Sequence, residues 1–180
     1  MLKTIRADCL GRMVLGSGVL LAGTDPSGCA DAGAMTALLE SAAAGDAFLG
    51  VTTGSTTVRC VPETKTLTVA GIPGAAEGCV AVTGWDIRLT GALHSWNDTA
   101  LRLLTGGAGV PAMAEEGETL CWAGDTPTGP VAVVLRNAVN HAGLSVTAKP
   151  DEPAALAFDF RARWEDGEAL PCTVYLAEEA

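Results

Sequence analysis

The stretch Leu156-Ala157-Phe158-Asp159-Phe160-Arg161-Ala162-Arg163-Trp164 carries the pattern that decides the fold. Apolar side chains occupy every second position of it, and Asp159, Arg161 and Arg163 stand between them. Successive side chains of a β-strand point to opposite faces of the sheet. The alternation therefore predicts a strand with one face, which includes Trp164, in a core and the other face in solvent.

Further segments predict more strands. Trp85–Thr90, Leu144–Ala148 and Thr66–Val69 alternate in the same way, which indicates half-buried strands. Val131–Leu135 is continuously apolar, which is typical of a strand that is covered on both faces. Thr173–Leu176 is predicted as the closing strand.

Two segments depart from the period of two. Met35–Ala44 predicts a short helix that ends at Gly45, because glycine is favoured just past a helix. Asn97 predicts the N-cap of a second helix, which interrupts the series of strands and ends at Gly106. The predicted fold class is mainly β, a β-sandwich or small barrel with one flanking α-helix near the middle of the chain.

Length and composition indicate a single domain over residues 1–180. Eleven Lys and Arg against 21 Asp and Glu give a net charge of −10. This charge argues against nucleic-acid binding as the main activity, because neutralising phosphates takes clustered cations. With 48% hydrophobic and 18% charged residues, the chain is typical of a compact domain that also buries surface against copies of itself.

The N-terminal region contains a stretch that is similar to a targeting signal. Met13–Gly23 is apolar and follows three basic residues, but Asp8 interrupts the leader and glycines break the apolar run. We therefore expect a first β-strand there rather than a secretory leader. No apolar run reaches the ~18 residues that span a bilayer, so no membrane is expected as a partner.

Residues that usually carry catalysis are few and scattered. His94 and His141 lie outside any metal-ligand spacing, and no nucleophile or phosphate-loop motif occurs. The six cysteines have no CxxC pair and are expected to be reduced and mostly buried. We therefore expect no enzymatic activity, no metal and no cofactor.

Six segments, in their order along the chain, resemble the tail tube (major tail) proteins of long-tailed bacteriophages. The motifs are Val-Pro-Glu-Thr-Lys-Thr-Leu-Thr-Val-Ala-Gly, a Trp-x-x-x-Leu-Thr-Gly-x-Leu strand, a short Leu-rich helix, a valine strand with Leu-x-Asn-Ala and then Gly-Leu, and two closing strands. They lie at Val61–Gly71, Trp85–Leu93, Asn97–Gly106, Pro130–Leu144, Ala155–Trp164 and Cys172–Leu176. The resemblance covers about residues 48–176, whereas the strand, loop and helix region at residues 1–47 matches poorly.

The resemblance implies a structural protein whose copies join edge to edge into a six-membered ring. In such rings the inner sheets merge into one β-barrel around a lumen, and the rings stack into a tube that conducts viral DNA as a non-specific passing cargo. The implied partners are further copies of the chain, a tape-measure protein and other tail proteins. The implied location is the virion tail, assembled in the host cytoplasm. Related tubes of contractile tails and bacterial secretion machines share the pattern.

Residues 61–80 are expected to form a projecting hairpin arm. The alternation at Thr66–Val69 indicates a hairpin, and the glycine-rich segment after it is too loose for a packed core strand. We expect Leu67, Val69 and Ile72 to supply an apolar contact with a neighbouring subunit or ring. An ordinary surface hairpin is the alternative.

The polar faces of two predicted strands are the candidates for the wall of the lumen. The net charge of −10 favours a negative wall. Arg161 and Arg163 are therefore expected to be compensated by carboxylates on adjacent strands, or to face away from the channel. The alternative is that both faces are outer, solvated surface. The candidates are Asp86, Arg88, Thr90, Asp159, Arg161 and Arg163.

A ligand-binding β-sandwich, such as a carbohydrate-binding or adhesin-like module, is the main alternative function. Such modules usually present exposed aromatic side chains to their ligands. Trp85 and Trp164 fall on the apolar phase of strands, and Trp96 lies where it packs on the second helix, so all three are expected in the core. Trp122 is the one tryptophan whose context leaves exposure open.

Overall fold

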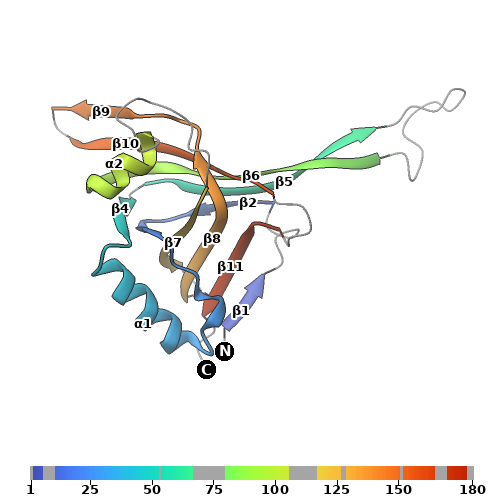
Figure 1. Ribbon diagram of the computed structural model, residues 1–180, viewed down its shortest axis with the longest axis horizontal. Coiled ribbons are helices and arrows are strands. Elements are labelled where there is room, and N and C mark those ends of the chain that lie inside the picture. The colour runs from blue at the N-terminus through green and yellow to red at the C-terminus, as the bar shows by residue number, and fades with distance from the viewer. Residues whose placement is uncertain are drawn as a thin grey trace, which may run out of the picture.

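Figure 1 shows the fold as a computed structural model, which describes residues 2–5, 11–52, 54–66, 80–105, 117–126, 129–150, 152–164 and 170–177. The strands are β1 (Leu2–Ile5), β2 (Gly11–Leu15), β3 (Gly18–Ala22), β4 (Phe48–Thr52), β5 (Thr56–Thr66), β6 (Val80–Trp96), β7 (Glu118–Thr126), β8 (Gly129–Asn140), β9 (Ser145–Lys149), β10 (Glu152–Ala162) and β11 (Cys172–Ala177). The helices are α1 (Ala32–Ala43) and α2 (Asp98–Thr105), and a 3₁₀ turn covers Pro26–Gly28.

Six antiparallel strands close into a barrel in the order β8-β7-β3-β4-β6-β10. The pairing of β10 with β8, from Phe160 opposite Asn140 to Ala162 opposite Ala138, closes the ring. The prediction of a mainly β fold is thus confirmed. The sandwich alternative is not confirmed. In the part of the chain that the structure describes, both predicted helices are present, so α1 joins the one flanking helix of the predicted fold class.

Five strands extend the sheet beyond the barrel. β11 pairs with β8 and carries β1 at its outer edge, while β9 pairs with the outer end of β10. β4 pairs with only the last residues of β6, and β5 pairs with the rest of the same edge of β6. β2 pairs in turn with β5. The strands β2-β5-β6-β10-β9 are therefore neighbours in this order, and β5 and β6 run together away from the barrel in Figure 1.

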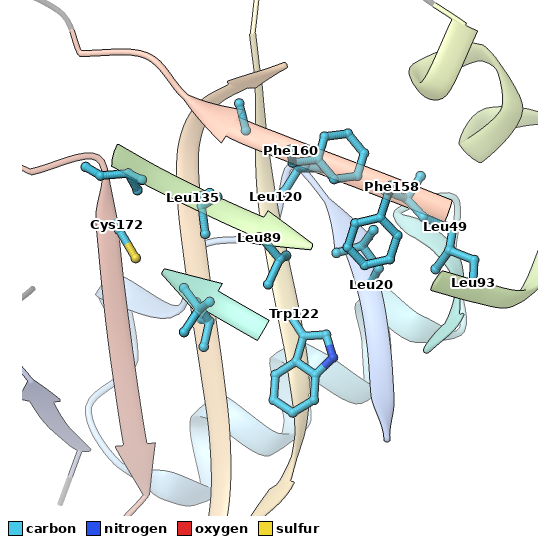
Figure 2. Close-up of a cluster of buried hydrophobic side chains, with 14 of the residues drawn as sticks. Leu20, Leu49, Leu89, Leu93, Leu120, Trp122, Leu135, Phe158, Phe160 and Cys172 are labelled. Atoms are coloured by element: carbon cyan, nitrogen blue, oxygen red, sulfur yellow. The ribbon is translucent and has the colours of Figure 1, made fainter. Parts of the chain in front are cut away.

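The barrel interior holds the larger of two apolar clusters. Side chains from all six barrel strands meet there, among them Leu20, Leu89, Trp122 and Phe160 (Figure 2). Trp122, whose exposure the sequence leaves open, is fully buried, and its Nε1 donates a hydrogen bond to Thr52 Oγ1 at 2.9 Å. Burial of this polar atom carries little cost because it has a partner.

The second apolar cluster lies between the outside of the barrel and α1. Met35 of α1 is fully buried against a cluster that includes Leu21 of β3 and Val134 of β8. Alternate residues of Val131–Leu135 face the two clusters, which confirms the predicted strand with both faces covered. This outer cluster fixes α1 against the barrel.

Capping residues set where the helices begin. Asp31 accepts a hydrogen bond from Ala34 N at 2.8 Å, so α1 begins at Ala32, three residues before the predicted start. Asn97 Oδ1 accepts one from Ala100 N at 2.9 Å, which confirms the predicted cap of α2. 

Three further predictions from the sequence are wrong. The segment 144–148 has no buried face, because its side chains are all exposed. Met13–Gly23 is not one first strand, because β2 ends at Leu15, β3 begins at Gly18, and β1 precedes both. Trp164 is 47% exposed instead of buried, because β10 ends at Ala162 and Trp164 lies beyond it.

Cys29, Cys121 and Cys172 are free thiols, as expected. Cys60, Cys121 and Cys172 are buried and Cys29 is half-buried. Burial raises the pKa of both Cys121 and Cys172 to about 12, which makes these thiols inert. Cys9 and Cys79 lie outside the described residues.

Candidate functional site

The predicted lumen candidates lie on one polar sheet face. Ile87 and Leu89 of β6 point into the barrel, so Asp86, Arg88 and Thr90 point outward. The same reasoning places Asp159 and Arg161 of β10 outward, because Phe158 and Phe160 are buried. The register sets Thr90 opposite Asp159 and Arg88 opposite Arg161. Arg163 follows the end of β10, and its N–H donates to Asn137 O at 3.0 Å.

Strand β5 adds residues that the sequence analysis missed. Val58 and Cys60 are buried, so Thr57, Arg59 and Val61 face outward beside the β6 residues. The alternation of apolar and polar residues at 56–61, at the start of the predicted arm, is the sequence signal for this outward face. We call the outward side chains of the three strands the outer sheet face. It consists of Thr57, Arg59, Val61, Asp86, Arg88, Thr90, Asp159 and Arg161.

Three arginines form a row across the outer sheet face. Arg59 lies opposite Arg88, and Arg88 lies opposite Arg161, so each of three neighbouring strands supplies one. The register continues this line to Arg12 of β2, which lies opposite Arg59. We call Arg59, Arg88 and Arg161 the arginine row. Neighbouring strands are about 4.8 Å apart, so like charges in this register repel one another.

Two carboxylates partly offset this charge. Asp86 accepts hydrogen bonds from Arg88 Nε at 2.7 Å and Nη2 at 2.8 Å, and its Oδ2 lies 3.1 Å from Arg59 Nε. Asp159 Oδ2 accepts from Arg161 Nη2 at 3.0 Å. The main partner of Arg88 and of Arg161 is thus on the same strand, two residues earlier, and not on an adjacent strand as expected for Arg161.

The carboxylates lie deeper than the guanidinium groups. The side chains of Asp86 and Asp159 are 12% and 20% exposed, whereas those of Arg59 and Arg161 are 46% and 41% exposed. The hydrogen bond with Asp86 raises the pKa of Arg88, so this residue stays charged. A depression of about 430 Å³ lies over part of the face, lined by Thr57, Arg59, Val61, Arg88 and Thr90.

His141 lies near the charged side chains of β10 on this face. Its main-chain N–H donates to Asp159 O at 2.7 Å. Burial and then the positive charge of Arg161 lower the pKa of His141, and Arg163 and Arg88 act in the same direction. The imidazole is therefore neutral at neutral pH and adds no charge there.

A second depression, also of about 430 Å³, lies where β5 and β6 leave the barrel. Trp85 and Trp164 line it together with Val82, Ala162 and Pro171. Val80 and Val82 are 52% and 57% exposed. They lie on the described stem of the arm, by which we mean the β5–β6 pairing up to Thr66 opposite Val80. The predicted contact residues Leu67, Val69 and Ile72 lie outside the described residues.

The strand β9 is an exposed edge. It pairs with β10 along one side, and the described side chains at 145–148 are all exposed. Val146 is 52% exposed, and Leu144 just before the strand is 48% exposed. At the other end of this five-strand order, β2 pairs with β5 alone among the described strands.

A separate charged network joins the loop after β3 to β8 and β11. Arg136 Nη2 donates to Asp25 Oδ2 at 2.6 Å, and Arg136 Nη1 donates to Thr173 Oγ1 at 3.0 Å. Burial alone would raise the pKa of Asp25, but hydrogen bonds from Ser27 N–H and Arg136 outweigh it and lower the pKa. This network fixes the loop on the barrel and shares no residue with the arginine row.

Comparisons with protein-family models, with curated proteins and with solved structures find no match to this chain. Among the described residues, no group of His, Cys, Asp and Glu side chains has the arrangement of a metal site. None of the helices in the described part is long and apolar enough to cross a membrane.

Proposed function

We propose that this chain is a structural protein whose copies join into rings, and that the rings stack into a tail tube that conducts viral DNA. The observation that carries the proposal is the five-strand order β2-β5-β6-β10-β9, whose two outermost strands have an unpaired side among the described strands. In β5, β6 and β10, one face of this sheet packs on the core and the other carries mainly polar side chains. Such a sheet becomes part of a larger barrel when β9 of one copy pairs with β2 of the next.

The composition of β9 supports such pairing. Monomeric proteins usually protect an edge strand with charges, proline or a covering element. Residues 145–148 are Ser, Val, Thr and Ala, and all are exposed. Pairing with another copy would cover both the free backbone groups and the Val146 side chain.

The arm supports contacts between copies in a second place. Val80 and Val82 continue an apolar strip from Trp85 onto the described stem, where no core covers them. In the proposed tube the arm contacts the neighbouring subunit or ring, through these valines and through Leu67, Val69 and Ile72. 

The resemblance supplies the remaining parts of the proposal. It implies six copies per ring, a tape-measure protein and other tail proteins as partners, and a place in the virion tail after assembly in the host cytoplasm. Under this proposal the outer sheet face lines the lumen. The chain carries a net charge of −10, whereas this face has three arginines against two aspartates, so its own charge is close to neutral.

A charge placed on the β9 edge tests the proposal. Val146→Lys should abolish rings, because a lysine on an edge strand disfavours pairing with another strand. The matched control is Leu38→Lys, which places the same charge on the exposed side of α1, where Leu38 is 37% exposed. Sedimentation velocity should show monomers for the first variant and rings for the second. Rings from Val146→Lys would contradict the edge contact.

A ligand-binding module is a second candidate, favoured by the exposure of Trp164. This side chain is 47% exposed and lines a depression with Trp85, an arrangement on which a sugar ring can stack. Titration with oligosaccharides, followed by tryptophan fluorescence, tests it. A saturable change that Trp164→Ala removes, in a protein that stays monomeric, would favour this function over the tube.

A further inference from the structure

The arginine row is an unusual concentration of positive charge in an acidic chain. The sequence has eight arginines and a net charge of −10, yet three arginines stand in register on three neighbouring strands. They are far apart in sequence, so only the strand register brings them together. The register also sets Arg12 at the end of the same line.

The fold does not need this row for its own stability. Like charges directly opposite on neighbouring strands are destabilising, and among the described residues two carboxylates pair with the three guanidinium groups. Thr57 and Thr90 on the same face show that uncharged polar residues fit these positions. A row that costs stability is expected to have a partner of opposite charge outside the chain.

The depth of the charged groups indicates how such a partner would meet the face. The carboxylates are 12% and 20% exposed, and the most exposed arginines are 46% and 41% exposed. An approaching anion therefore meets guanidinium groups before carboxylates. The depression lined by Arg59 and Arg88 gives it a concave place to lie.

The chemistry of the face selects among anions. Guanidinium groups match phosphate oxygens with paired hydrogen bonds. The row spans about 10 Å from Arg59 to Arg161, so it suits a chain of phosphates better than a single one. The other outward side chains of the face are threonine, valine and the two aspartates, without the Asn, Gln or aromatic groups that read bases.

We propose that the arginine row contacts the phosphate backbone of double-stranded DNA, without sequence preference. The choice of DNA rests on the proposed function, in which this face lines the lumen and the row recurs in every copy. Asp86 and Asp159 keep the contact weak, so DNA is held in the axis and still slides. This differs from the net-negative wall expected from the charge of −10.

Fluorescence anisotropy with the purified protein and a labelled duplex of about 30 base pairs tests the inference. The titrations cover about 20 to 200 mM NaCl. The wild-type protein should bind weakly and lose affinity as salt rises. Arg59→Gln/Arg161→Gln should lower the salt slope by about two, because each phosphate contact contributes about 0.9. The matched control Arg102→Glu changes the net charge by the same amount at an exposed position on α2 and should bind like wild type.

A gain of affinity provides a second readout that loss of folding cannot imitate. Asp159→Asn removes a carboxylate that offsets Arg161, so it should bind DNA more tightly than wild type. No binding by the wild-type protein at about 20 mM salt would overturn the inference, as would equal losses in the double variant and in Arg102→Glu, or unchanged affinity of Asp159→Asn.

Electron microscopy of the same samples separates this inference from the proposed function. Rings without any DNA binding would refute the contact and leave the tube. DNA binding by a protein that forms no rings at any concentration would leave the contact and refute the tube.

Discussion

Arg136 shows how one residue can hold a loop on the barrel. Its guanidinium donates to Asp25 Oδ2 at 2.6 Å and to Thr173 Oγ1 at 3.0 Å, which joins the loop after β3 to β8 and β11. The side chains of Arg136 and Asp25 are 33% and 27% exposed, so solvent weakens the ion pair but does not cancel it. Charge-assisted hydrogen bonds of this kind are among the stronger ones.

The pH dependence of stability should report this pair. The pKa of Asp25 is below its ordinary value of 3.8, so its contribution is complete above that value and is lost as the pH falls through the lower folded-state pKa. Arg136→Gln should lower the free energy of unfolding by about 1 kcal/mol at pH 7. The difference from wild type should shrink at about pH 3, measured by urea unfolding.

The control for this prediction is Arg102→Gln on α2, whose exposed side chain should make its substitution nearly neutral at both pH values. A deficit in Arg136→Gln that is the same at pH 7 and at about pH 3 would show that Asp25 is not the partner that matters.

The described part of the arm is a long pair of strands whose side chains have no core of their own to pack against. β5 and β6 pair from Thr57 opposite Thr90 to Thr66 opposite Val80. The side chains at 62–66 and at 80–83 are exposed. A two-stranded ribbon is marginal alone, so a surface contact is the expected reason for its length.

Deletion of residues 64–76 should leave a folded monomer that fails to polymerise. The described residues that the deletion removes, 64–66, are exposed and belong to neither core cluster, so far-ultraviolet circular dichroism and the melting temperature should stay close to wild type. Sedimentation velocity should show that tubes are lost. A milder variant, Val80→Ser/Val82→Ser, should weaken assembly in the same direction. Normal tubes from the deletion variant would refute the arm as a contact.

Local patterns predict single elements better than their arrangement. The alternation at 156–162 and the cap at Asn97 each depend on neighbours in sequence, and both are seen in the structure. Trp164 follows the same alternation but lies past the end of β10, where the barrel no longer covers it. Periodicity tells which face a residue takes and not where the core stops.

The barrel and the arginine row could not be predicted because both depend on register. The barrel closes through three residue pairs between β10 and β8, and no local pattern distinguishes this from a sandwich. The sequence predicts that Asp86, Arg88 and Asp159 lie on the polar faces of two strands. That these faces adjoin, and that Arg59 completes a row, follows only from how β5, β6 and β10 pair.

The whole molecule combines a closed barrel with strands that remain open to pairing. Closure of the six barrel strands provides a stable unit with a filled interior (Figure 2). Among the described strands, β1, β2 and β9 each pair with a single neighbour. A ring that joins β9 to β2 uses two of these edges in every copy and leaves neither exposed.

Electron cryomicroscopy of the purified wild-type protein over a wide concentration range tests whether the chain forms the proposed tube. We predict six-membered rings in end views, stacked tubes in side views, and a map in which β9 of one subunit pairs with β2 of the next around a lumen lined by the outer sheet face. Dispersed monomers at every concentration, or rings joined through other surfaces with that face turned outward, would contradict it.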